Sequence, residues 1–438
     1  MSTQIDIQPR RFDDYVSTIG EEAAEEIRYL AGKLKGARVL HVNATAVGGG
    51  VAELLVSLVP LMNDLGLATE WKVMKGSRRF FDVTKALHNT LQGMDISVTP
   101  AMWRLWRYYN KRNAELMKGD YDFAVVHDPQ PAGLLAYTKK RTEGIESNKW
   151  IWRCHIDLTT PQAQVWKGLQ RYLVPYDATV FTLEGFINRD AKLPRPTVSP
   201  PGIDPLSEKN KPLSRDLTDY VLNKYGVDTT RPYILQAARM DLWKDPLGVL
   251  EAYRIVKKEI PEVQLVYLAA MANDDPEGWV YYETTVKAAG SDPDIHLFPN
   301  VVYGIGDAEV SAFQTGAAVI LQKSLREGFG LSVTEALWKA RPVIAGRVGG
   351  IPLQVIDGET GYLVDSPQEC ADRIIRVLKD EKLGQRLGEA GREHARKNYL
   401  ITRYLRDYLK LFLDLTEGPE ISRNGRETKL PQAVHGED

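Results

Sequence analysis

Residues 317–346, AAVILQKSLREGFGLSVTEALWKARPVIAG, carry the pattern that decides the fold. An apolar stretch of strand length is followed by a loop with two glycines, a stretch of helix length and a second apolar stretch. A strand, a loop, a helix and a further strand form the repeating unit of parallel doubly wound sheets. This segment therefore predicts an α/β fold.

The same unit occurs near the other end of the chain. ARVLHVNAT predicts a strand, AVGGG a loop, VAELLVSLVPLMNDLG a helix and ATEWKVM the next strand. Further buried strands are expected at 121–129, 149–158 and 177–184, and the pattern starts afresh at 231–240, 263–271, 294–300 and 341–350. The sequence thus predicts two successive Rossmann-like domains, whose strand ends would face a central cleft.

A segment rich in proline, serine and charge separates the two halves. PPGIDPLSEKNKPLSRDLTDY, residues 200–220, is expected to act as a hinge. We place the first domain at 1–215 and the second at 216–399, followed by a helix at 400–415 and a mobile tail at 416–438.

Composition narrows the class of protein. The chain has 438 residues, 43% apolar and 26% charged, with a formal net charge of -2, so neither nucleic acid nor a membrane is expected as a partner. Its two cysteines are far apart, and the N-terminus has no apolar signal-peptide region. These features are typical of a cytoplasmic protein.

The loop and helix start at 327–331 are the first candidate site. Glu327 follows a strand and could accept hydrogen bonds from sugar hydroxyls, while the amides of Gly328–Leu331 lie at a helix N-terminus that favours phosphate. Glu335 has an alternative explanation, because SVTE (332–335) matches a helix capping box. Capping accounts for neither Glu327 nor the glycines.

Two cations and a glycine loop follow other strands. Arg239 and Lys244 lie just after the strand at 231–240 and could clamp a diphosphate, although a solvated basic loop is a common alternative. Gly49 and Gly50 open a helix after a strand, which suits either phosphate binding or a tight turn.

The first half has its own polar candidates. His155 and Asp157 lie near the end of the strand at 149–158, and Asp128 lies after the strand at 121–129. A histidine in an apolar strand is more often a satisfied core residue, and Asp128 could simply cap a turn. No zinc or Ser–His–Asp spacing is present in the sequence.

Together, these motifs resemble family 4 retaining glycosyltransferases of the GT-B fold. The resemblance rests on EGFGLSVTE, ARMDLWKDP, the GGG loop and VGGIPLQVIDGETGYLV, in that family's arrangement over both halves. VHDPQP, WRCHIDLTTP, PPGIDPLSEKN, DDPEGW and REGFGLSVTEALW are more closely similar to the trehalose glycosyltransferring synthases. The likeness spans most of residues 10–415.

The resemblance implies roles for these residues. Glu327 would bind the hydroxyls of the donor glucose and Glu335 the ribose, with the amides of Gly328–Leu331 against sugar and phosphate. Arg239 and Lys244 would hold the diphosphate. The donor-site residues would be Gly49, Gly50, Arg239, Lys244, Glu327, Gly328, Phe329, Gly330, Leu331 and Glu335.

The resemblance also implies an acceptor site and a reaction. His155 would lie beside the donor sugar, and Asp128, His155 and Asp157 would bind the acceptor glucose in the first domain. The implied reaction joins UDP-, ADP- or GDP-glucose to free glucose to form α,α-trehalose. His155, Arg239, Lys244 and Glu327 would be the catalytic residues. No metal would be required, although Mg could stimulate the reaction, and the helix at 400–415 would cross back to the first domain.

Several alternatives remain open from the sequence. A trehalose phosphorylase or a sucrose-type synthase would share the donor half, and a non-catalytic nucleotide-sugar-binding protein would share the fold. An NAD-dependent dehydrogenase is disfavoured because GxGxxG and a downstream ribose-binding acid are missing from the sequence. The preferred nucleotide and a possible homodimer are not decided by these motifs.

Overall fold

The computed structural model describes residues 5, 7–46, 49–138, 148–188, 191–271 and 276–416. Within these residues the chain forms two compact units. Unit 1 contains the residues up to Pro201 together with those from Ile401 onward, and unit 2 contains Gly202–Leu400.

Unit 1 is built around a six-stranded sheet of order β2-β1-β3-β4-β5-β6. Every paired strand in it runs parallel to its neighbour. The strands are β1 (Arg38–Asn43), β2 (Ala68–Val73), β3 (Phe123–His127), β4 (Lys149–Arg153), β5 (Ala178–Phe181) and β6 (Pro196–Val198). The helices are η1 (Phe12–Tyr15), α1 (Val16–Ile19), α2 (Glu21–Lys33), α3 (Gly50–Asp64), α4 (Arg78–Leu91), α5 (Pro100–Asn113), η2 (Ala114–Met117), η3 (Leu134–Tyr137), α6 (Ala163–Leu173), η4 (Glu184–Phe186) and α16 (Ile401–Thr416).

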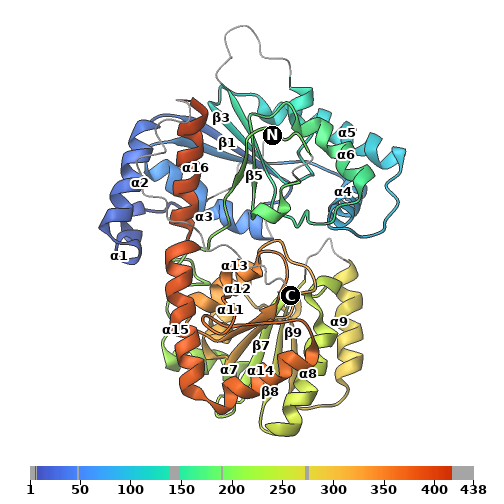
Figure 1. The fold of residues 1–438 in the computed structure, drawn as a ribbon, viewed down its shortest axis with the longest axis vertical. Coiled ribbons are helices and arrows are strands. Elements are labelled where there is room, and N and C mark those ends of the chain that lie inside the picture. Colours follow the sequence, from blue (N-terminus) through green and yellow to red (C-terminus); the bar gives the residue numbers. More distant parts are fainter. Residues whose placement is uncertain are drawn as a thin grey trace, which may run out of the picture. The chain divides into compact units, whose positions relative to one another are not determined.

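Helices cover both faces of this sheet (Figure 1). Leu40 and Val42 of β1 share a core with apolar residues of α4, α5 and α6. On the other face α16 packs against α2 and α3, and the ring of Phe412 stacks on Phe123 of β3 at a centroid distance of 4.2 Å. The last described helix of the chain therefore completes the core of the first unit.

Unit 2 repeats this architecture with strand order β12-β11-β10-β7-β8-β9, again with parallel pairs. The strands are β7 (Tyr233–Arg239), β8 (Gln264–Ala270), β9 (Ile295–Pro299), β10 (Val319–Gln322), β11 (Val343–Gly346) and β12 (Tyr362–Val364). The helices are α7 (Arg215–Lys224), η5 (Leu242–Lys244), α8 (Pro246–Glu259), α9 (Pro276–Ala289), α10 (Asn300–Tyr303), α11 (Asp307–Gly316), α12 (Leu331–Trp338), α13 (Ile351–Gln354), α14 (Pro367–Lys379) and α15 (Glu381–Asn398).

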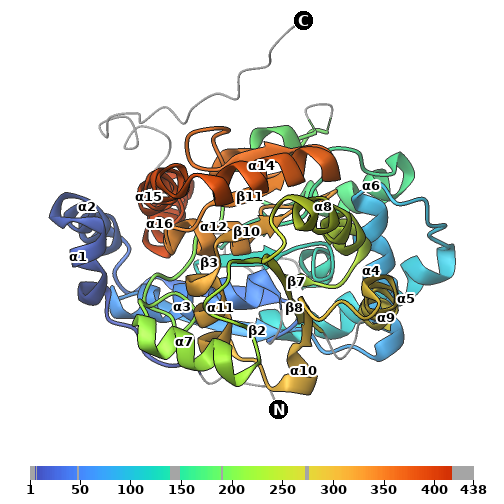
Figure 2. The same cartoon turned by 90° about the horizontal axis from the view of Figure 1, so that it is seen from below.

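The two faces of the second sheet also have separate cores. Ile234 of β7 packs with α8 and α14, whereas its neighbour Leu235 packs with α7, α11 and α12. Figure 2 shows α8 and α14 on one side of the strands and α7 and α11 on the other. This alternation places helices on both faces, so the predicted pair of doubly wound halves is confirmed.

The segment between the halves differs from the expected hinge. Ile203 bridges to Leu400, and its amide donates to the Tyr399 carbonyl at 2.9 Å. The indole of Trp338 donates to the Asn210 carbonyl at 3.1 Å. Residues 202–215, which the sequence analysis assigned to the first domain, are therefore packed into unit 2, because their backbone groups have partners there.

Two short strands, β6 and β12, were not predicted. Each has three residues, too few to give a periodic pattern. The expected mobile tail lies outside the described residues apart from Thr416, which ends α16. Among the described helices none has both the length and the apolar composition needed to cross a bilayer.

Candidate active site

Lys244 and Glu327 meet at the carboxyl edge of the sheet of unit 2. Lys244 ends η5, just after β7, and Glu327 lies in the loop after β10. The Lys244 ammonium donates to Glu327 Oε2, and Gln322 Nε2 and Ser324 Oγ each lie 3.3 Å from the same oxygen. β7 and β10 are adjacent, so two predicted site residues 83 positions apart become direct partners.

Glycines fix the backbone around Glu327. Gly349 has φ 53°, and a Cβ there would lie 1.6 Å from the Glu327 carbonyl oxygen. A Cβ on Gly350 would lie 2.8 Å from the Gly328 carbonyl oxygen. The loop after β11 thus packs directly on the backbone that carries Glu327, at a distance that no side chain allows.

Gly330, with φ 85°, is the N-cap of α12, which begins at Leu331. The capping-box alternative for Ser332 and Glu335 is therefore wrong, because Ser332 lies inside the helix and its hydroxyl donates to Gln322 Oε1 at 3.0 Å. Phe329, also predicted here, is buried and its carbonyl accepts from Gln354 Nε2 at 2.5 Å. No side chain caps α12 at Gly330, so its first amides remain available to a ligand, whereas the Val333 amide already donates to the Gly330 carbonyl at 3.0 Å.

Glu335 is almost fully buried, with a relative exposure of 2%. Lys209 Nζ lies 2.8 Å from one of its carboxylate oxygens, and Gln314 Nε2 donates to the other at 2.9 Å. Burial acts to raise the pKa of Glu335, but the charges of Lys209 and Lys339 outweigh it and lower the pKa. The carboxylate is therefore ionised and anchored to two partners within unit 2.

Arg239 is the last residue of β7 and has a side chain that is about half exposed, at 48%. Its Nε lies 3.5 Å from Asp241 Oδ2, and Asp241 Oδ1 accepts from the Lys244 amide at 3.2 Å. Asp241 thus links the two predicted cations and limits where each can move.

Sequence reasoning missed a second buried ion pair in this region. Lys323, the residue after β10, is buried and pairs with Asp245, which precedes α8 and has φ 48°. The charge pattern of the sequence holds no sign of this pair, because its members are 78 positions apart. It connects the loop after β7 to the loop after β10, the two that carry Lys244 and Glu327.

In unit 1, the glycine loop opens α3. Gly49 is the N-cap with φ 94°, and Gly50 is the first helical residue. No side-chain hydrogen bond from the N-cap residue closes this helix, which begins in the loop after β1. Val47 and Gly48, in the same loop, lie outside the described residues.

Asp128 follows β3 in a strained backbone conformation, with φ 67°. Its carbonyl accepts from the Trp152 indole at 3.0 Å, and its Oδ1 accepts from the His155 amide at 2.7 Å. Burial raises its pKa to about 6, against the opposing effects of that amide and of Arg153. Strain and a perturbed carboxyl together are typical of a functional residue.

Asp157 does not share a strand face with His155, because β4 ends at Arg153 and both residues lie in the loop beyond it. Asp157 is buried, and its Oδ1 accepts from the Thr159 amide at 2.8 Å and the Thr159 hydroxyl at 2.6 Å. It thus stabilises its own loop, whereas Asp128 and His155 are directly joined.

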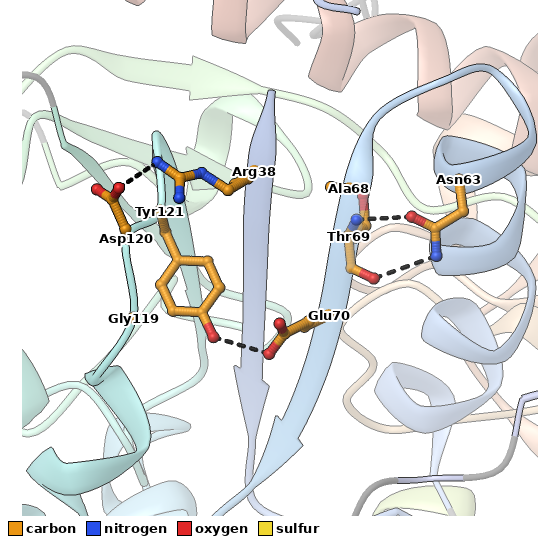
Figure 3. Close-up of a pocket in the computed structure, with 8 residues that line it drawn as sticks. All are labelled: Arg38, Asn63, Ala68, Thr69, Glu70, Gly119, Asp120 and Tyr121. Atoms are coloured by element: carbon orange, nitrogen blue, oxygen red, sulfur yellow. Dashed lines mark hydrogen bonds and ion pairs between the residues drawn. The ribbon is translucent and has the colours of Figure 1, made fainter. Parts of the chain in front are cut away.

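A pocket of about 330 Å³ lies elsewhere in unit 1, at the amino ends of β1 and β2 (Figure 3). Its polar groups pair with one another: Arg38 with Asp120 at 2.6 Å, Tyr121 with Glu70 at 2.7 Å, and Asn63 with the backbone of Thr69. Ligands of parallel sheets bind at the carboxyl ends, so this pocket lies at the wrong edge for the chemistry.

Comparison with known proteins gives a family match for each of the two units. Residues 41–188 match the model for the N-terminal domain of trehalose synthase, and residues 221–394 match glycosyl transferases group 1. A trehalose synthase of Rubrobacter xylanophilus is 50% identical over 405 residues, which cover 92% of this chain and 96% of that protein. The chain belongs to the trehalose synthase family. It is therefore a glycosyltransferase.

The chain is also similar to more distant proteins. A trehalose phosphorylase of Pleurotus pulmonarius is 26% identical over 461 residues, covering 94% of this chain but 62% of that protein. The solved structure of the trehalose-6-phosphate synthase OtsA superposes with a TM-score of 0.69 at 16% identity, covering 86% of this chain and 99% of that one. This structural similarity confirms the predicted GT-B fold of this trehalose synthase family member.

Proposed function

We propose that this protein transfers glucose from a nucleoside-diphosphate glucose to free glucose, forming α,α-trehalose with retention of configuration. The observation that carries the proposal is the pairing of Lys244 with Glu327 beside the uncapped N-terminus of α12. A carboxylate, a cation and free amides within one loop cluster suit a ligand that joins sugar hydroxyls to a diphosphate.

Unit 2 binds the donor in this proposal. Glu327 accepts hydrogen bonds from glucose hydroxyls, and Lys244 and Arg239 bind the diphosphate. The amides at Gly328–Leu331 bind sugar and phosphate oxygens. Glu335 binds the ribose, which requires at least one of its bonds to Lys209 and Gln314 to be exchanged, because both oxygens are already in use.

Unit 1 binds the acceptor glucose through Asp128 and His155, with Gly49 and Gly50 close to the diphosphate. Asp157 has a weaker case as a direct ligand, since its Oδ1 already accepts two hydrogen bonds from Thr159. We therefore assign Asp157 to the acceptor site mainly through the loop that it stabilises.

The chemical step breaks the bond between the anomeric carbon and the phosphate oxygen. Negative charge grows on the departing diphosphate, where Lys244 and Arg239 stabilise it, and positive charge grows on the sugar ring. The acceptor hydroxyl forms the new bond from the same face and gives its proton to the departing phosphate. Because protein cations offset the leaving charge, no metal is required in this proposal, and Mg would at most stimulate the reaction.

Product analysis tests the proposal. The protein is incubated with glucose and UDP-, ADP- or GDP-glucose, with and without EDTA, and the products are separated and quantified. We expect α,α-trehalose and the nucleoside diphosphate in equal amounts, with activity retained in EDTA. In a second incubation with trehalose and inorganic phosphate, formation of glucose 1-phosphate and glucose would favour a trehalose phosphorylase instead.

Two other outcomes would point elsewhere. Transfer to fructose in preference to glucose would indicate a sucrose-type synthase. Tight binding of a nucleotide sugar with no turnover of any acceptor would indicate a non-catalytic binding protein.

A further inference from the structure

Three histidines of unit 1 form a continuous hydrogen-bonded chain that begins at His155. His155 Nε2 lies 3.0 Å from His127 Nδ1, and His127 Nε2 lies 3.0 Å from His41 Nδ1. Adjacent rings are nearly parallel, at 19° and 27°, with centroids 5.3 Å apart in both pairs. The chain runs from the loop that carries His155 through the end of β3 into β1.

Burial increases along this chain. His155 is half-buried, whereas His127 and His41 are 1% and 0% exposed. Burial lowers the pKa of His41 to about 3. Burial also lowers the pKa values of His127 and His155, and the nearby Arg153 guanidinium lowers both further. Each ring is therefore neutral and carries a single proton.

Among the described residues, no group accepts a hydrogen bond from the inner end of the chain, His41 Nε2. Arg153 of β4 is a permanent cation, and Asp128 accepts from the backbone of His155 and not from its ring. Tyr408 of α16 presents its ring to His41 at 77° and a centroid distance of 5.8 Å. His41 Nε2 is buried and has no hydrogen-bond partner among the described residues.

This inner end decides the direction of the chain. Three neutral imidazoles can share their protons in two ways, with every proton on Nε2 or every proton on Nδ1. The first places an unpaired N–H at the buried end, with at most a weak contact to the Tyr408 ring. The second leaves only a lone pair there, and a buried unpaired donor is the rarer and costlier defect.

We infer that His41 and His127 are positioning residues that hold His155 as the neutral Nδ1–H tautomer, so that its free ring nitrogen is a hydrogen-bond donor. His155 then donates to an oxygen of the bound sugar and does not accept a proton during transfer. This inference rests on the proposed function for the identity of the ligand, but the tautomer itself is a property of the protein alone.

The decisive measurement is nuclear magnetic resonance of the ¹⁵N-histidine-labelled full-length protein. Ring nitrogen shifts distinguish the Nδ1–H tautomer, the Nε2–H tautomer and the imidazolium ion. Signals are assigned by loss in His155→Gln, His127→Phe and His41→Phe. We expect three neutral Nδ1–H rings from about pH 5.5 to about pH 8.5, the range in which an exposed histidine titrates.

The variants test whether the inner histidines act through His155. In His127→Phe, we expect the His155 signal to shift to a mixture of the two neutral tautomers, with a loss of about 10-fold in kcat and a change below about 3-fold in the donor KM. His296→Phe is the matched control, because His296 is a partly buried histidine of unit 2 whose Nε2 also lacks a partner. It should leave the His155 signal and kcat unchanged.

Two substitutions at His155 distinguish the effect of its Nδ1–H donor from the effect of its contact with His127. His155→Asn keeps an amide N–H near the position of Nδ1, whereas His155→Gln keeps contact with His127 but moves the amide away from that position. We expect His155→Asn to retain about 10-fold more activity. Nε2–H rings, an imidazolium at His155, or higher activity in His155→Gln would each overturn the inference. Failure of trehalose synthesis with normal Nδ1–H signals would overturn only the proposed function.

Discussion

Lys244 and Glu327, which the sequence suggested as separate ligands for phosphate and sugar, are hydrogen-bonded to each other. Their charges offset one another in a region where both side chains are mostly buried, at 16% and 12% exposed. A donor that engages both must share or replace this contact. In the proposed function, the pair would therefore couple sugar binding to diphosphate binding.

Removal of Glu327 should abolish transfer without unfolding the protein. In Glu327→Ala, Lys244 loses the partner that orients it, and the glucose loses its carboxylate ligand. We expect activity to fall by about 1,000-fold or more, measured as trehalose formed from nucleotide sugar and glucose. Unchanged activity with an unchanged circular dichroism spectrum would contradict the assignment.

Loss of either cation should affect kcat more than acceptor binding. Lys244→Ala and Arg239→Ala each remove a contact that strengthens as charge grows on the diphosphate, worth roughly 2–4 kcal/mol, so kcat should fall about 30- to 1,000-fold. Lys244 should cost more, because Arg239 is half exposed and screened by water. A pure increase in the glucose KM in both variants would show that neither holds the diphosphate.

Gly349 should be far less tolerant than another glycine of the same conformation. In Gly349→Ala the new methyl group would collide with the Glu327 carbonyl, whereas in Gly358→Ala, with φ 80°, it would meet nothing within 4 Å. Both carry the backbone strain of a positive φ, about 1–2 kcal/mol. We expect only the cost of strain in Gly358→Ala, and a larger loss of stability together with loss of transfer in Gly349→Ala, measured by urea unfolding and steady-state kinetics.

Asp128→Asn should stabilise the protein at neutral pH while lowering its activity. The pKa of Asp128 is raised to about 6 from 3.8, so its contribution to stability is full below about pH 3.8 and is lost as the pH rises through 6. The side-chain oxygen of asparagine can accept the same hydrogen bond from the His155 amide, and asparagine tolerates a positive φ.

We therefore expect Asp128→Asn to unfold at higher urea concentration near pH 7.5, by ~1–2 kcal/mol, and to match the wild type near pH 4. Activity with glucose should fall about 10-fold or more if the carboxylate binds the acceptor. Equal stability of the two proteins at both pH values would show that ionisation of the Asp128 carboxyl group does not destabilise the folded protein.

Glu335→Gln should reduce both stability and nucleotide recognition. The substitution leaves Lys209 as a mostly buried cation without its carboxylate, which we expect to cost about 1–3 kcal/mol in urea unfolding. In the control Lys209→Met, Glu335 keeps its carboxyl group and its Gln314 contact. If Glu335 binds ribose, the donor KM should rise in Glu335→Gln and not in Lys209→Met, whereas equal changes would assign it a structural role.

The sequence predicted most of the fold because parallel strands buried on both faces are continuous apolar runs, such as that of β7 and that of β8. The site was predictable where it follows such a run, as with Glu327 after β10. It was not predictable where partners are distant. SVTE matches a capping box, and only Gly330 at φ 85° shows that the N-cap of the helix lies two residues before Ser332.

Other parts of the site depend on contacts that no local pattern contains. Lys209 meets Glu335 across 126 positions, and His41 reaches His127 across 86. The segment at 202–215 has the composition of a linker, yet Ile203 pairs with Leu400 and is itself buried. Composition alone predicts a flexible linker here, because it contains no information on the long-range hydrogen bonds that fix this segment in unit 2.

The bridge between Ile203 and Leu400 has a consequence for synthesis on the ribosome. Both ends of unit 2 meet there, so that unit can finish folding before α16 emerges. The sheet of unit 1 must wait for α16 to cover Phe123, while the roughly 200 residues between are translated, about 10–40 s at ordinary rates. During that interval the part of the sheet around Phe123 that α16 later covers is exposed, and nascent chains should depend most on chaperones.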